Sequence, residues 1–201
     1  MKKQALMIAG AALAMAFSAF ASAQGSKFNP GPYVGVEGGY VQATVPKHEG
    51  YRITSESKNA GFVRGMLGYQ FTPNWALELG YFGTGDVKRS DTNGAHSYDE
   101  KYKASGADLA VLYKLTEMLP GIYVKAGLTY AKVTEDIVES RAGGFKYHGS
   151  GTGTGYLFGL GYEYDFTPAW SANANYTRYQ RVANVPGVNL NQLGVGVKYR
   201  F

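Results

Sequence analysis

The chain has 201 residues with 28 glycines, 17 tyrosines and no cysteine, and its formal net charge is +5 at pH 7. The lack of cysteine excludes a disulfide framework and thiol chemistry. Acidic residues are mixed among the basic ones, so the sequence lacks the concentrated basic patch that nucleic-acid binding requires.

The N-terminus predicts a secretory signal peptide. A basic start at residues 2–3 is followed by an alanine-rich apolar stretch at 6–20 and by the small-residue motif Ala21-Ser22-Ala23. We predict residues 1–23 as the signal peptide, cleaved between Ala23 and Gln24, and 24–201 as a single β-barrel domain. A membrane anchor helix is the alternative interpretation, although the apolar run is short for one.

Eight segments of the mature chain alternate apolar residues with small or polar ones. Successive side chains of a strand point to opposite faces, so each segment would carry one apolar and one polar face. Segments of about ten residues suit a tilted strand that crosses the hydrocarbon layer. We predict strands at 33–43, 60–71, 75–83, 103–115, 122–133, 153–166, 170–179 and 192–201.

The connections between these strands alternate in length. Residues 72–74, 116–121 and 167–169 form short turns, whereas 44–59, 84–102, 134–152 and 180–187 form long polar loops. This asymmetry is typical of outer-membrane barrels, whose short turns are periplasmic. Two of the short turns share the pattern aromatic-Thr-Pro-x-Trp, at 71–75 and 166–170, which indicates an aromatic girdle at the membrane interface.

The apolar faces require a closed structure. The mature chain has no apolar run long enough for a transmembrane helix. A barrel is then the one structure that crosses a bilayer with every backbone group paired. We therefore predict an all-β fold, an eight-stranded antiparallel up-and-down transmembrane β-barrel.

Three motifs resemble the small eight-stranded outer-membrane barrels of the OmpA-like and OmpX-like group. They are the first strand at 33–40, the turn region at 68–81 and the terminal Lys198-Tyr199-Arg200-Phe201. The resemblance covers essentially the whole mature chain and does not include the peptidoglycan-binding domain of larger relatives. It implies a signal for the barrel-assembly machinery in Val197, Tyr199 and Phe201, although Phe201 can equally serve as a girdle aromatic.

The predicted lumen faces carry a balanced set of charges. An eight-stranded barrel is just wide enough for its own side chains, and buried charges need partners. We predict a structural charge network that plugs the lumen; a narrow ion path is the alternative. Its members are Glu37, Arg64, Glu78, Asp108, Lys125, Glu163, Lys198 and Arg200.

The sequence predicts no catalytic, cofactor-binding or metal site. His48, His96 and His148 fall in predicted loops without metal-ligand spacing. The glycine-rich stretch 149–155 indicates a mobile loop, because no strand-to-helix turn follows it. Residues 176–184 loosely resemble the late strand of lipid A deacylases but lack the serine and histidine of that chemistry.

We therefore expect an integral protein of the Gram-negative outer membrane with a structural or surface-interaction, adhesin-like role. Its expected partners are outer-membrane lipid and lipopolysaccharide, the assembly machinery, and a host or surface ligand bound by the loops. Basic loop residues could contact lipopolysaccharide phosphates, with ordinary solvation as the alternative. A narrow porin-like channel and a lipid A-modifying enzyme remain alternatives, and a soluble periplasmic ligand-binding barrel is a more remote one.

Overall fold

The computed structural model describes residues 30–44, 52–57, 59–92, 97–139, 146–185 and 187–201. The predicted signal peptide and its cleavage site between Ala23 and Gln24 lie outside the described residues. The elements are β1 (Gly31–Thr44), β2 (Arg52–Ser57), β3 (Asn59–Gln70), β4 (Trp75–Thr84), β5 (Val87–Thr92), β6 (Ser97–Lys114), β7 (Ile122–Glu139), β8 (Lys146–Asp165), β9 (Trp170–Gln180), the 3-10 turn η1 (Val182–Asn184) and β10 (Asn189–Arg200). In this part of the chain no helix has the length and apolarity of a membrane span.

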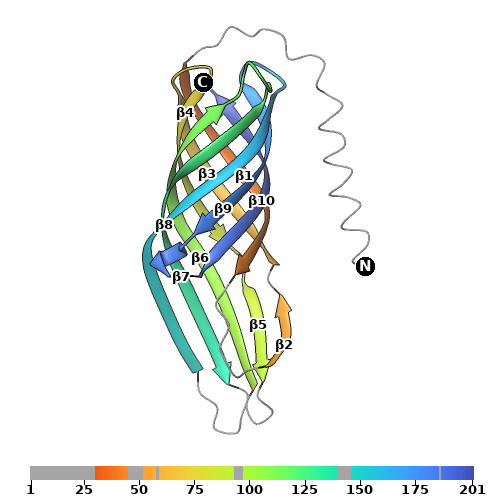
Figure 1. Cartoon of the computed structure of the whole chain (residues 1–201), viewed down its shortest axis with the longest axis vertical. Helices are drawn as coiled ribbons and strands as arrows, with labels where there is room; N and C mark the ends of the chain where they lie inside the picture. The colour runs from red at the N-terminus through yellow and green to blue at the C-terminus, as the bar shows by residue number, and fades with distance from the viewer. Residues whose placement is uncertain (1–29, 45–51, 58, 93–96, 140–145, 186) are drawn as a thin grey trace, which may run out of the picture.

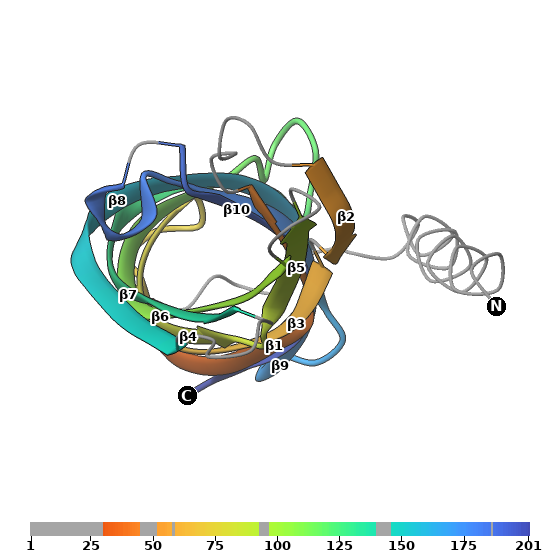
Figure 2. The same cartoon turned by 90° about the horizontal axis from the view of Figure 1, so that it is seen from below.

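Eight of the strands close into a barrel. Their order is β6-β4-β3-β1-β10-β9-β8-β7, and the pairing of β6 with β7 joins the two ends of the sheet. Every neighbouring pair is antiparallel, and the view along the axis shows the closed ring (Figure 2). The predicted all-β, eight-stranded up-and-down barrel is confirmed.

The predicted alternation holds along the barrel wall. Over the whole of β3 and nearly all of β4, every second side chain is buried and the others are exposed. On β4 the outward side chains are apolar, and Leu79 and Tyr81 are 51% and 64% exposed. A continuous exposed apolar surface is expected of a barrel whose outer face contacts lipid rather than water.

The two Thr-Pro turns have the same geometry. In each, the threonine hydroxyl accepts a hydrogen bond of 2.9 Å from the backbone N–H of the tryptophan three residues later, Trp75 or Trp170. The tryptophan rings lie outside the barrel and pack on tyrosines of the neighbouring strands, Trp75 on Tyr113 at 4.8 Å and Trp170 on Tyr199 at 5.0 Å between ring centroids. These pairs form the aromatic girdle that the repeated motif predicts.

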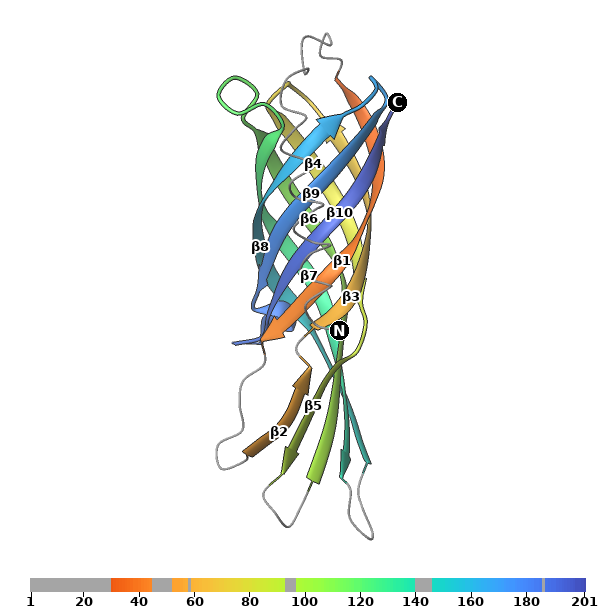
Figure 3. The same cartoon turned by 90° about the vertical axis from the view of Figure 1, so that its right-hand side faces the viewer.

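At the opposite end, three of the four predicted long loops are largely strand. The predictions of loops at 44–59, 84–102 and 134–152 were wrong in this respect. β2 and β5 lie within the first two, and β6, β7 and β8 run for 18, 18 and 20 residues, well beyond the barrel (Figures 1 and 3). The ladders β6–β7 and β7–β8 continue without a break because both partners keep their backbone groups in register. His148 and the glycine-rich stretch 149–155 therefore belong to β8 rather than to a loop.

The fourth connection folds back over the barrel mouth through η1. Arg181, Ala183 and Asn184 all have left-handed backbone conformations, with φ of 53°, 57° and 60°. The turn approaches β8 so closely that a Cβ on Gly153 would lie 2.6 Å from the carbonyl oxygen of Ala183. The absence of a side chain at Gly153 is what allows η1 to pack there.

Candidate functional site

The centre of the lumen is organised around one arginine. Arg64 of β3 is 1% exposed and reaches across β4 to Asp108 of β6, with Nη2–Oδ1 at 2.6 Å and Nε–Oδ2 at 3.0 Å. Its Nη1 lies 2.8 Å from Glu78 Oε1 and 3.3 Å from Glu37 Oε2. A guanidinium with five N–H donors in a plane suits this task, since it can hold three carboxylates at once.

A second cluster fills the periplasmic half of the lumen. Lys198 Nζ lies 3.3 Å from Glu78 Oε2 and 3.1 Å from Glu163 Oε2. Lys114 Nζ lies 2.5 Å from the other oxygen of Glu163, and Arg200 is 3.8 Å from the same atom at the mouth. Glu78 thus joins the ion pairs of Arg64 to those of Lys198 and Lys114, and the interior is one connected network.

Seven of the eight predicted lumen residues meet in these two clusters, and the eighth, Lys125, lies within electrostatic range of Glu37, Glu78 and Asp108. The Lys125 side chain is buried, but among the described residues it forms no ion pair. Sequence reasoning missed Lys114, although the alternation of its strand placed it inward. It also missed four neutral side chains that donate hydrogen bonds to the carboxylates, those of Tyr33, Asn173, Asn175 and Tyr179. A fifth, Gln70, accepts hydrogen bonds from Lys114 and Arg200 through its side-chain oxygen.

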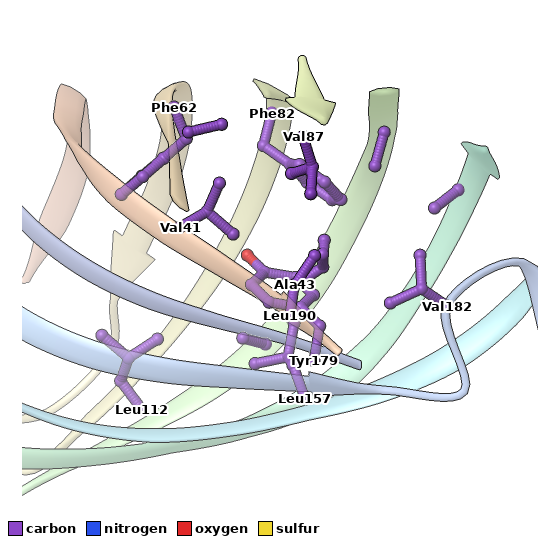
Figure 4. Close-up of a cluster of buried hydrophobic side chains, with 14 of the residues drawn as sticks. Val41, Ala43, Phe62, Phe82, Val87, Leu112, Leu157, Tyr179, Val182 and Leu190 are labelled. Atoms are coloured by element: carbon purple, nitrogen blue, oxygen red, sulfur yellow. The ribbon is translucent and has the colours of Figure 1, made fainter. Parts of the chain in front are cut away.

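The extracellular half of the lumen contains a large apolar cluster, whereas the sequence predicted a polar interior, and buried Thr177 and Gln192 lie beside this cluster. Apolar side chains of six strands meet there in the buried cluster shown in Figure 4, namely Val41, Ala43, Phe62, Phe82, Leu157, Tyr179 and Leu190. Phe82 and Tyr179 stack at 4.9 Å between ring centroids, and the Tyr179 hydroxyl donates to Asp108 at 3.2 Å. Tyr179 therefore marks the boundary between the apolar and the charged halves of the plug.

The three residues of the predicted assembly signal lie on the outer face of the terminal strand. Val197 and Phe201 are exposed, Tyr199 is half-buried, and the rings of Tyr199 and Phe201 pack edge to face at 5.1 Å. The backbone N–H of Phe201 donates to the Pro32 carbonyl at 3.2 Å, next to the first strand. The terminal aromatics thus belong to the girdle and lie at the seam where β1 and β10 close the barrel.

The strand extensions carry lysines on their outer face. Lys88 of β5 lies directly opposite Lys101 of β6, and Lys103 follows two residues later on the same face. Lys132 of β7 is opposite Ser105 and therefore diagonal to Lys103. All four lysines are exposed and lie just beyond the apolar belt. We call this set the lysine cluster.

One histidine lies beside the lysine cluster. His148 Nδ1 contacts Asp136 Oδ1 at 2.5 Å on the exposed face of β7 and β8, while His48 and His96 lie outside the described residues. Among the residues that the structure describes, no three metal-ligating side chains gather in one place. The contact is a surface hydrogen bond between two strands.

Comparison with known proteins places the chain among outer-membrane barrels. A family model, "Outer membrane protein beta-barrel domain", matches residues 9–201. A search of curated proteins gives no match.

Among solved structures, the chain is similar to Ail, the attachment invasion locus protein of Yersinia pestis, with 19% identity and a TM-score of 0.55 over 85% of this chain and 99% of that one. A structure of Ail in complex with the heparin analogue sucrose octasulfate covers the same shares with 16% identity and a TM-score of 0.53. Neisserial surface protein A has 18% identity and a TM-score of 0.50, over 85% of this chain and 97% of that one. These similarities show a shared fold.

Proposed function

Because this chain belongs to the family of outer membrane protein beta-barrel domains, we propose that it is a surface-interaction protein of the Gram-negative outer membrane. Its plugged barrel would serve as the anchor, and the extended strands would present the lysine cluster to an anionic ligand. The chemistry recognised is that of phosphate or sulfate groups.

The observation that carries this proposal is the pairing of Lys88 with Lys101. Like charges directly opposite each other on a sheet are destabilising, and Lys103 adds a third ammonium group on the same face. Asp136, opposite Lys101, and Asp99, two residues before Lys101 on the same face of β6, are acidic neighbours of the group. The four lysines of the cluster outnumber these two carboxylates, and this excess of positive charge favours binding of a multivalent anion, which would relieve the repulsion.

Two sources of such anions are within reach of the cluster. The phosphates of lipopolysaccharide lie in the outer leaflet, next to the apolar belt, and sulfated polysaccharides occur on host surfaces. The similar barrel of Ail was solved with a heparin analogue. The heparin analogue is a ligand of Ail, and for this chain it supports only the proposal that sulfate or phosphate groups are recognised.

The test compares the wild-type barrel with a variant that carries Lys88→Gln, Lys101→Gln and Lys103→Gln. Binding to immobilised heparin would be measured with the protein in nanodiscs of phospholipid alone and of phospholipid with lipopolysaccharide. We expect the variant to lose most of its binding, and a Lys→Arg triple variant to keep it, because arginine preserves the charge. Weaker heparin binding in the lipopolysaccharide discs would identify the lipid as the competing ligand. Equal binding by the glutamine variant would refute the proposal.

The two alternative functions have direct tests. A lipid A-modifying enzyme would change the mass spectrum of lipid A on expression, and we expect identical spectra. A narrow channel would conduct ions in planar bilayers, and we expect no steady conductance.

A further inference from the structure

A pocket opens at the extracellular mouth of the barrel, on the inner side of the strand extensions. Its volume is about 390 Å³, within the range of small-molecule sites. Its walls come from strands on opposite sides of the barrel and from the segment that contains η1. Most of the lining is apolar, including Ala43, Val87, Val133, Val185, Val188 and Leu190.

The polar part of the pocket lining contains one carboxylate, that of Glu135, and one lysine, Lys103. Because Lys103 follows Tyr102 directly in β6, its exposed side chain leaves the strand on the opposite face from the Tyr102 ring. Tyr102 and Glu135 line the pocket, and the Tyr102 hydroxyl lies 2.7 Å from Glu135 Oε1 and 2.9 Å from Glu100 Oε2. A phenol has one proton, so it can donate to only one of the two carboxylates at a time. Burial and the two glutamates raise the pKa of Tyr102 well above its usual value, which keeps the phenol neutral. The inward face of this wall therefore presents two carboxylates with a single neutral donor between them, while Lys103 extends from the other face.

The wall opposite Tyr102 and Glu135 is formed by the segment that contains η1, and backbone contacts hold this segment in place. η1 packs on β8 at Gly153, and the backbone N–H of Val182 donates to the Val188 carbonyl at 3.0 Å. Val182 and Ala183 of η1 are themselves buried. The pocket is thus formed before any ligand arrives, which lowers the entropy cost of binding.

We propose that this pocket binds a small cationic amphiphile, with its ammonium group beside Glu135 and Tyr102 and its apolar body against the valines and Leu190. Carboxylates and an aromatic ring are the groups that recognise an ammonium ion in a partly dry site. The site shares Lys103 with the lysine cluster, but the two lie on opposite faces of the strand extensions. The side chains of Glu135 and Asp136 point to opposite faces of β7, so the inner face takes cations and the outer face takes anions.

The first experiment compares three probes of the same shape and different charge. Phenethylamine, phenethyl alcohol and phenylacetate would be titrated into the full barrel in phosphatidylcholine nanodiscs, with methyl NMR shifts of the pocket valines as the readout. We expect the amine to bind about tenfold more tightly than the alcohol, and phenylacetate to bind most weakly. Equal affinities for amine and alcohol would show a purely apolar pocket and overturn the proposal, as would the absence of amine binding.

Matched variants separate the pocket from the rest of the surface. Glu135→Gln should abolish the preference for the amine, whereas Asp136→Asn removes the same charge from the outer face and should leave it unchanged. Gly151→Leu should block all three probes, because Gly151 lines the pocket and a Cβ there meets no atom within 4 Å. Heat-modifiable gel mobility would verify folding of each variant. Retained amine preference in Glu135→Gln, or binding in a folded Gly151→Leu barrel, would overturn the proposal.

Discussion

Arg64 and Asp108 join two strands that are not neighbours, because the guanidinium passes over Gly80 of the strand between them. A Cβ at Gly80 would lie 2.4 Å from Nη2 of Arg64, so only glycine leaves room for this path. The bidentate contact between Arg64 and Asp108 therefore depends on Gly80, a residue without a side chain.

Gly80→Ala should destabilise the barrel by displacing Arg64 from Asp108. We expect a loss of about 2 kcal/mol in the free energy of unfolding, measured with urea in lipid vesicles. Gly83→Ala on the same strand is the control, since a Cβ there meets no atom within 4 Å. An equal effect of both variants would show that the passage over Gly80 is unimportant.

Glu78→Gln should be among the most damaging substitutions of the lumen. Glu78 pairs with Arg64 and Lys198 and accepts the Tyr33 hydroxyl at 3.1 Å, so its loss would leave buried cations underpaired. The expected cost is about 3 kcal/mol. The thermal midpoint in detergent provides the measurement, and an unchanged midpoint would argue against a network that is coupled through Glu78.

Lys125→Met should have little effect or raise the midpoint. The four lumen acids already have four bases in Arg64, Lys114, Lys198 and Arg200, and Lys125 is buried with no ion pair among the described residues. Replacing such a charge with an apolar chain of similar length removes a desolvation cost. A drop as large as that of Glu78→Gln would show that Lys125 supports the network over a longer distance.

The purified wild-type barrel should produce no steady conductance in planar bilayers. The cavity at its periplasmic mouth measures about 10 Å³, room for roughly one water molecule, and Phe82 and Tyr179 fill the lumen above Asp108. Steady single-channel steps that disappear when the protein is omitted would instead support the porin-like alternative.

The terminal aromatics should matter for assembly in the cell more than for stability. Phe201→Ala with Tyr199→Ala should reduce the folded, heat-modifiable fraction in outer membranes, while refolding of the same variant in detergent should proceed normally. Val195→Ala, also exposed on β10, is the control. Normal assembly of the double variant in cells would show that Tyr199 and Phe201 contribute to the girdle but not to assembly.

Much of the architecture can be derived from the residues alone. The period of two identifies eight crossings, their outward faces and the lumen-facing charges, because it is a local property of a strand and needs no knowledge of its neighbours. The repeated Thr-Pro turns identify the girdle for the same reason. The same alternation also predicts that the side chain of Lys114 points into the lumen.

The three-dimensional arrangement decided the rest. Strand register and closure determine that Arg64 meets Asp108 across an intervening strand, that Lys125 has no direct partner, and that Val41, Phe62 and Leu190 share one end of the lumen. The strand extensions were not predicted because their polar residues match those of a loop, and only pairing with neighbouring strands stabilises them as strands. The pocket beneath η1 likewise depends on segments far apart in the chain, since a cavity is a property of packing and no single stretch of residues encodes it.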